Sequence, residues 1–156
     1  MRSLNILFPV SFLFVGISCS AQFFNASHVP TESKIILADL HPQVGSKVTW
    51  TQEPEGYQAA FVLHNQPHYV LFDFQGNYMA EASTINKRSL PKRIRKHLRE
   101  TYRTFRIQQT ILIKSSSGDK LYETRVTHGT EDYKLIFNDS GYILEVLPLP
   151  VSLTEE

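Results

Sequence analysis

The side chains best suited to catalysis or metal binding in this sequence are six histidines and a single cysteine. His64 and His68 flank the segment Asn65-Gln66-Pro67, so their imidazoles could approach each other across a short turn. Two imidazoles without a carboxylate or a thiolate are an incomplete ligand set for zinc, and we predict no metal and no other cofactor. The sequence also lacks a Gly-x-Ser-x-Gly elbow, a phosphate-binding glycine loop and a His-Glu-x-x-His helix. We therefore expect a protein that is not an enzyme.

A strongly basic segment is the most distinctive feature of the charge pattern. The chain has a formal net charge of +1, yet residues 87–106 hold nine of its 16 Lys and Arg residues and a single acid, Glu100. Such a layout could steer an acidic protein, lipid headgroups or another polyanion to this segment. The residues we expect to make that contact are Lys92, Lys96, Arg99 and Arg103. In the alternative interpretation these cations form a solvated helix face, balanced by acids such as Glu131 and Asp132.

The first 21 residues have the layout of a secretory signal peptide. Arg2 is followed by a mostly apolar run from Leu4 to Ile17 and then by small residues up to Ala21. The run is shorter than the roughly 20 apolar residues of a membrane-spanning helix. We predict an exported protein, periplasmic or secreted, that is cleaved after Ala21 and has no contact with nucleic acid. In the alternative, Cys19 is the lipidated first residue of a lipoprotein, which is the case in which we expect a membrane association.

Length and composition fit one globular domain. The 156 residues are 42% hydrophobic and 20% charged, which suits a packed core and excludes a disordered or collagen-like chain. A single cysteine excludes an intramolecular disulfide.

The body of the chain contains an internal similarity. A shift of 65 residues superposes three identical residues without a gap: Tyr57 on Tyr122, Phe72 on Phe137 and Gly76 on Gly141. The shared pattern is an aromatic residue, then an apolar run ending in Phe-Asp/Asn-x-x-Gly, then a second apolar run. We therefore predict two tandem units in one continuous domain, residues 28–86 and 87–150.

Each unit is predicted to be one helix followed by four strands. Alternating apolar residues indicate half-buried strands, and apolar residues at helical spacing indicate helices. Ser89 is expected to cap the second helix. The expected helices cover residues 30–41 and 91–104, and the expected strands cover 47–52, 57–64, 68–74, 77–85, 106–114, 120–128, 132–138 and 142–149.

The motifs at the helix starts and in the turns resemble those of a known family. The Val29-Pro30 and Leu90-Pro91 helix starts, with Phe72-Asp73-x-x-Gly76 and Phe137-Asn138-x-x-Gly141, resemble tandem units of the PepSY-like, or β-lactamase-inhibitor-protein-like, exported bacterial family. The resemblance implies exported α+β domains with a curved sheet. Because relatives act as protein inhibitors or inhibitory propeptide modules, it also implies protein recognition rather than catalysis. The chain departs from the family pattern at Asn138, which replaces the Asp of the first unit.

The predicted fold class is α+β, with two tandem helix-plus-four-strand units forming one antiparallel sheet of about eight strands and both helices on one face. The other face should then be open to a partner. The residues expected on it are Gln58, Tyr69, Asp73, Met79, Glu81, Glu123 and Lys134.

Tyr69, Asp73 and Met79 are the residues of that face that we expect to contact a partner. The predicted function is recognition of another exported or envelope protein, or of a peptide, with inhibition as one form it could take. One alternative is an envelope-associated module that docks on anionic surfaces through the basic helix. Another is a small-molecule carrier with a pocket between helices and sheet. The sequence predicts neither the partner's identity nor the oligomeric state.

Overall fold

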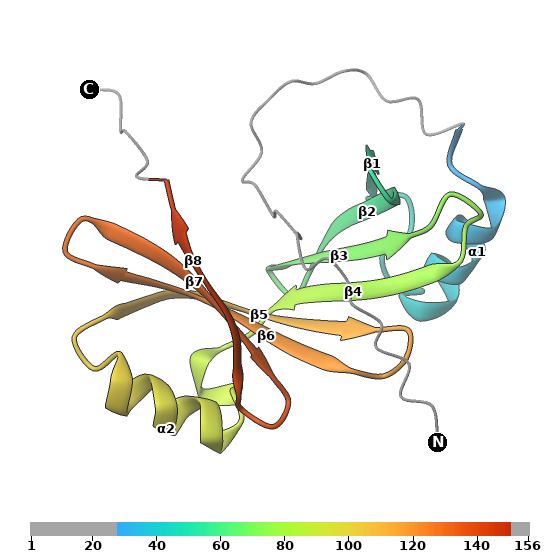
Figure 1. Cartoon of the computed structure of the whole chain (residues 1–156). Coiled ribbons are helices and arrows are strands. Elements are labelled where there is room, and N and C mark those ends of the chain that lie inside the picture. Colours follow the sequence, from blue (N-terminus) through green and yellow to red (C-terminus); the bar gives the residue numbers. More distant parts are fainter. Residues whose placement is uncertain (1–27, 151–156) are drawn as a thin grey trace, which may run out of the picture.

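A computed structural model describes residues 28–150 of the chain (Figure 1). The predicted signal peptide and Cys19 lie outside these residues. The two α-helices are α1 (Thr31–Leu40) and α2 (Lys92–Thr101), and a short 3-10 helix, η2 (Lys87–Ser89), precedes α2. The strands are β1 (Thr49–Glu53), β2 (Gly56–Leu63), β3 (Gln66–Phe72), β4 (Tyr78–Thr84), β5 (Arg106–Ser115), β6 (Lys120–His128), β7 (Glu131–Asn138) and β8 (Ile143–Leu149).

The eight strands form one antiparallel sheet in which each strand pairs with its neighbours in the sequence, in the order β1 to β8. The junction between the two groups of four strands is the pairing of β4 with β5, which runs from Ala80 opposite Ser115 to Thr84 opposite Ile111. The segment between them contains η2 and α2. Because the ladder continues across this junction, residues 28–150 form one sheet whose edge strands are β1 and β8.

Both helices cover the same face of the sheet, which we call the first face. Leu37 of α1 packs in one buried cluster with Val70 of β3, and Leu98 of α2 packs in another with Tyr122 of β6. Residues directly opposite each other share a face, and the registers of β3 with β4, β4 with β5 and β5 with β6 place Val70 and Tyr122 on the same side. Figure 1 shows α1 beside the β1–β4 half and α2 beside the β5–β8 half.

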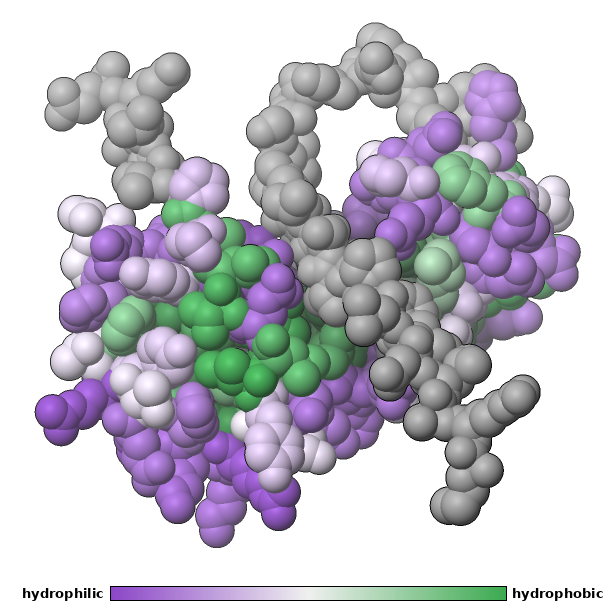
Figure 2. Space-filling view, in the orientation of Figure 1, coloured by the Kyte–Doolittle hydropathy of each residue, from purple (hydrophilic) through white to green (hydrophobic). Residues whose placement is uncertain are grey.

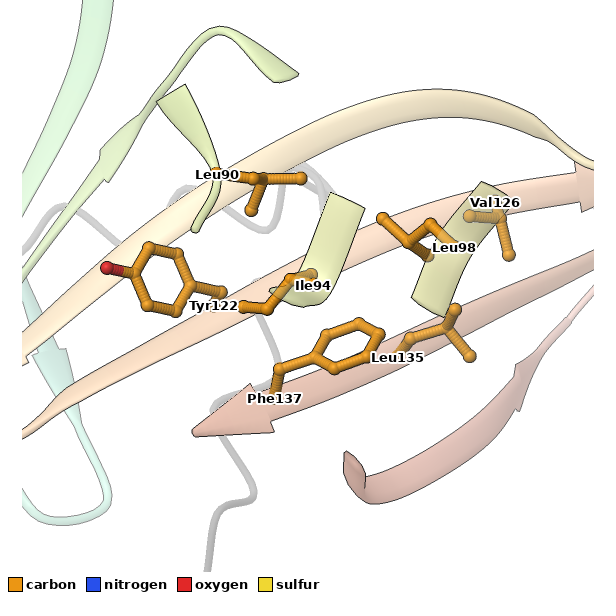
Figure 3. Close-up of a cluster of buried hydrophobic side chains, with 7 residues drawn as sticks. All are labelled: Leu90, Ile94, Leu98, Tyr122, Val126, Leu135 and Phe137. Atoms are coloured by element: carbon orange, nitrogen blue, oxygen red, sulfur yellow. The ribbon is translucent and has the colours of Figure 1, made fainter. Parts of the chain in front are cut away.

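The helix α2 is held by an apolar stripe on an otherwise charged helix. Ile94 is fully buried and Leu98 nearly so, while the Lys and Arg residues of the helix are exposed. Burying a side chain of this size contributes about 1.5–3 kcal/mol, which supports a helix that has no side-chain cap. Figure 3 shows the cluster between α2 and the sheet, which consists of Leu90, Ile94, Leu98, Tyr122, Val126, Leu135 and Phe137.

The turn between β3 and β4 is organised by Asp73. Its carboxylate Oδ1 accepts hydrogen bonds from the backbone N–H of Gln75 at 2.9 Å and of Asn77 at 2.8 Å. Its own N–H donates to the carbonyl of Asn77 at 3.0 Å, and the N–H of Gly76 donates to the carbonyl of Asp73 at 3.0 Å. These bonds close the turn locally, so the motif Phe-Asp-x-x-Gly is a turn signal.

The turn between β7 and β8 has corresponding bonds. Oδ1 of Asn138 accepts from the N–H of Tyr142 at 2.9 Å. The N–H of Asn138 donates to the carbonyl of Tyr142 at 3.0 Å, and the N–H of Gly141 donates to the carbonyl of Asn138 at 2.9 Å. An amide oxygen accepts these bonds as a carboxylate oxygen does, which explains how Asn serves at this position.

Each of these turns presses its glycine against the first turn of a helix. A Cβ atom placed on Gly76 would lie 3.0 Å from Cβ of Pro30, before α1. One placed on Gly141 would lie 2.8 Å from Cβ of Arg93, in α2. The φ angles of the two glycines are +93° and +84°, a region that favours glycine. Both the close approach and the backbone conformation therefore require glycine here.

The predicted fold class is confirmed, with small shifts at the ends of elements. The second helix ends at Thr101 rather than near residue 104. The expectation that Ser89 caps this helix is wrong, because Ser89 lies in η2 and Pro91 occupies the N-cap position of α2.

Candidate interaction surfaces

The second face of the sheet, opposite the helices, is buried along its middle. Ala82 of β4 lies directly opposite Tyr69 on one side and Ile113 on the other. Because alanine is short, the larger side chains beside it can meet over it. The buried residues of this cluster are Ala80, Ala82, Ile111 and Ile113, with Tyr69 and Leu121 packed against them. The expectation of an open face therefore holds only towards its margin, where Thr49 and Val62 are exposed.

A buried ion pair lies on the same face over β6 and β7. Oε2 of Glu123 is 3.8 Å from Nζ of Lys134, and the side chains retain 1% and 6% of their exposure. Nε of Arg125 donates to Oε1 of Glu123 at 3.3 Å. Glu123 and Lys134 therefore lie on the predicted face, but each is engaged within the chain and neither is presented to solvent.

The three predicted contact residues all belong to the β3–β4 hairpin, in three different environments. Tyr69 is half-buried at the border of the apolar cluster on the second face. Asp73 lies in the turn, where hydrogen bonding by the Asn77 side chain holds the pKa of its carboxyl below the ordinary value. Met79 has no partner on β3, because the register shifts from Leu71 opposite Ala80 to Phe72 opposite Tyr78. Asp73 and Met79 lie at one end of the hairpin, while Tyr69 lies towards its middle.

Met79 marks a β-bulge, and the same irregularity occurs in the second half of the sheet. Ile136 is opposite Glu145 and Phe137 is opposite Ile143, so that Leu144 is the extra residue. A bulge adds one residue to one strand and re-aims the side chains around it. Leu144 is 54% exposed.

Glu81 was expected on the second face and lies on the first. It is directly opposite Val70 and forms a cluster with two histidines beneath α1. Its Oε1 is 3.3 Å from Nε2 of His41, the residue that ends α1, and 3.5 Å from Nδ1 of His68. His68 also stacks on Phe61 with ring centroids 5.5 Å apart.

This cluster was missed by sequence reasoning because its three polar residues come from separate elements. His64, the other member of the predicted histidine pair, is exposed in the β2–β3 turn and has a φ of +50°. Across residues 28–150, no three His, Cys, Asp or Glu residues are arranged to hold a metal ion.

The cations of the basic segment are exposed and largely without acidic partners in the described residues. All nine Lys and Arg side chains from Lys87 to Arg106 are exposed. One ion pair within this segment is Lys96 with Glu100, at 4.0 Å between well-exposed groups, and a pair of this kind contributes little. Glu131 and Asp132, the acids expected to balance the segment, accept hydrogen bonds from the hydroxyls of Tyr133 and Thr127 respectively.

An exposed apolar strip runs along the free edge of the sheet at β8. Tyr142, just before the strand, is 69% exposed, and Leu144 and Val146 are 54% and 44% exposed. Figure 2 shows hydrophobic surface over the β7–β8 part of the molecule, directly above the hydrophilic side chains of α2. Large apolar side chains gathered on one surface are a feature of interaction sites. None of the helices between residues 28 and 150 is long and apolar enough to cross a membrane.

The chain has an α+β fold similar to that of a BLIP-like protein of known structure. Three solved structures from Bacteroides share the fold. The first is a protein of Bacteroides eggerthii DSM 20697 that is expected to be periplasmic (TM-score 0.73, 15% identity, 81% of this chain and 93% of that chain). The second is a DUF2874 family protein of Bacteroides uniformis ATCC 8492 (TM-score 0.71, 17% identity, 81% and 93%). The third is a BLIP-like protein of Bacteroides fragilis NCTC 9343 (TM-score 0.66, 17% identity, 82% and 92%).

At these identities the likeness shows the fold alone, and it supports the BLIP-like part of the predicted resemblance. No family model matches the chain, and no curated protein matches it either.

Proposed function

We propose that this protein is an exported, non-enzymatic module that binds another protein or a peptide. The observation that carries the proposal is the strip Tyr142, Leu144 and Val146, three large exposed apolar side chains at one free edge of the sheet. The β8 backbone pairs with β7 at Val146 and on both sides of the bulge residue Leu144, so the ordering of these side chains costs little on binding. The second face near Tyr69 is a further candidate for the same contact.

Export is supported by the signal-peptide layout of residues 1–21 and by the expected periplasmic location of the structural relative from Bacteroides eggerthii. The family proposal is a PepSY-like variant of the BLIP-like fold, supported by the turn motifs at Asp73 and Asn138. We propose inhibition as one form that this binding takes, since one structural relative is described as BLIP-like.

Site-specific photo-crosslinking in cells that export the full chain tests the proposal. The photoreactive residue p-benzoylphenylalanine would replace Tyr69, Leu144 or, as a control, Ser116, which is exposed in the β5–β6 turn. We expect a discrete cross-linked protein from Tyr69 or Leu144 and none from Ser116. The absence of a discrete adduct at both sites, or the same adducts at all three, would contradict the proposal.

A further inference from the structure

The outer side of α2 and the edge strand β8 form one composite surface, here called the ledge. It consists of Arg93 and Lys96 on α2 and of Leu144 and Val146 on β8. Arg93 lies beside the β7–β8 turn. A Cβ atom placed on Gly141 in that turn would be 2.8 Å from Cβ of Arg93. Lys96 is on the same side of the helix, three residues further on.

The apolar part of the ledge exists because the α2 cluster reaches Ile143 at the start of β8 but leaves Val146 partly exposed. Val146 is directly opposite Leu135, a buried member of the α2 cluster, and therefore lies on the first face. Leu135 is fully buried under the helix, whereas Val146 on the next strand is 44% exposed. The edge strand beside the helix is thus only partly covered.

Both charged side chains that define the ledge are basic. Arg93 and Lys96 belong to the segment of nine Lys and Arg residues with one acid, and the exposed pair of Lys96 with Glu100 spans 4.0 Å. A partner that covers the apolar strip therefore brings its own groups next to cations, where acidic groups are favoured and basic groups are repelled.

We infer that the ledge binds an acidic polypeptide segment with apolar residues, which lies along β8 with its carboxylates towards Arg93 and Lys96. Because the exposed apolar residues follow a single strand, they suit an extended chain better than a flat membrane. Pro148 removes one backbone N–H donor from β8, so a chain that lies along this strand has one backbone hydrogen bond fewer to form there. This inference rests on the proposed function and specifies the partner's chemistry.

Selection of short random peptides displayed on phage against the full chain tests the inference. We expect the enriched peptides to combine Asp or Glu with Val, Leu or Ile. The best synthetic peptide, measured by fluorescence anisotropy, should bind at least about tenfold more weakly to Arg93→Glu/Lys96→Glu. The variant Leu144→Ser/Val146→Ser should lose a similar factor.

A matched control keeps the test specific. The variant Lys114→Glu/Lys120→Glu makes the same change in net charge at two exposed positions near the β5–β6 turn, and it should leave peptide affinity within about twofold. Equal loss in both charge-reversed variants would overturn the inference, as would enriched peptides without acids. Circular dichroism of each variant checks that the fold is intact.

Other occupants of the ledge are outcomes of the same experiment. Binding of the protein to phosphatidylglycerol vesicles without selection of any acidic peptide would overturn the inference in favour of an anionic membrane surface. A dimer that Leu144→Ser dissociates in sedimentation would overturn it in favour of a second copy of the chain. If cross-links form at Tyr69 or Leu144 while no acidic peptide is selected, the proposed function stands and the inference falls.

Discussion

Nζ of Lys134 lies 3.8 Å from Oε2 of Glu123 on the second face of the sheet, and both side chains are almost completely buried. Removing one partner of a buried pair leaves an uncompensated charge, which typically costs about 3–5 kcal/mol. We expect Lys134→Met to destabilise the protein by about 3 kcal/mol, the lower end of that range, because Arg125 still donates to Glu123. Urea unfolding measures the change.

The companion variant is Glu123→Leu/Lys134→Met, which removes both charges. Well-packed apolar replacements of a buried pair are often neutral, so the double variant should recover most of the loss. A single variant as stable as the wild type would show that the pair is not buried in solution.

The packing of α2 predicts that replacing Ile94 with alanine destabilises the protein much more than the same replacement of Ile35 on α1. Ile94→Ala opens a cavity at a fully buried position between α2 and β7 and should cost about 2–5 kcal/mol. Ile35→Ala makes the same chemical change on α1 at a half-exposed position, where surface substitutions stay within about 0.5 kcal/mol. Equal losses measured by thermal unfolding would contradict the packing of α2 on the sheet.

Replacing Gly141 of the β7–β8 turn with alanine should cost more stability than replacing Gly118, which has a similar backbone conformation. Gly141 and Gly118 have φ angles of +84° and +90°, so both substitutions to alanine incur the left-handed cost of about 1–2 kcal/mol. A Cβ on Gly118 meets nothing within 4 Å, whereas one on Gly141 meets Arg93. Gly141→Ala should therefore lower the free energy of unfolding by at least about 1 kcal/mol more than Gly118→Ala does. Urea unfolding measures both.

We expect Asp73 to make a contribution to stability that is lost in acid. Asn138, at the corresponding position of the β7–β8 turn, has no carboxyl group and should make no such contribution. Hydrogen bonding by Asn77 lowers the pKa of Asp73 from the ordinary 3.8, so the carboxylate is favoured by folding. This contribution is complete above the ordinary value and is lost as the pH falls through the lowered pKa. Asp73→Asn should preserve the turn and flatten the stability profile below about pH 4.

The reciprocal variant Asn138→Asp provides the control for this prediction. In the unmodified protein Asn138 accepts a hydrogen bond from the N–H of Tyr142. With Asp at this position, stability should fall as the new carboxylate is protonated in acid. The two profiles are compared by chemical unfolding between pH 2 and pH 6, a window of about two units on either side of the carboxyl pKa. Unchanged profiles in both variants would show that the carboxylate does not stabilise the turn.

Much of the fold could be predicted because its signals are local. Alternation in Tyr57 to Leu63 and helical spacing of Ile94 and Leu98 identify their elements within a few residues along the chain. The turn motif around Asp73 is likewise satisfied by atoms no more than four residues away. Such patterns can be recognised without knowledge of the distant parts of the chain.

The faces of the strands could be predicted only in part, because alternation within one strand does not give its register against the next. Tyr69 and Glu81 were expected on one face, but Tyr69 pairs with Ala82, and Glu81 therefore faces α1. The bulge at Met79 adds one residue at the end of this ladder, and a shift of one residue exchanges the faces of a strand.

The amino-acid sequence by itself determined the order of helices and strands, the two Phe-Asp/Asn-x-x-Gly turns and the concentration of cations in residues 87–106, since each depends on neighbours along the chain. The tertiary structure decided which side chains those elements bury. It buried Glu123 and Lys134 together, brought His41 and His68 to Glu81, and left Val146 uncovered beside α2. These relationships depend on strand register and on the reach of each helix over the sheet, which are set by contacts between residues far apart in the sequence.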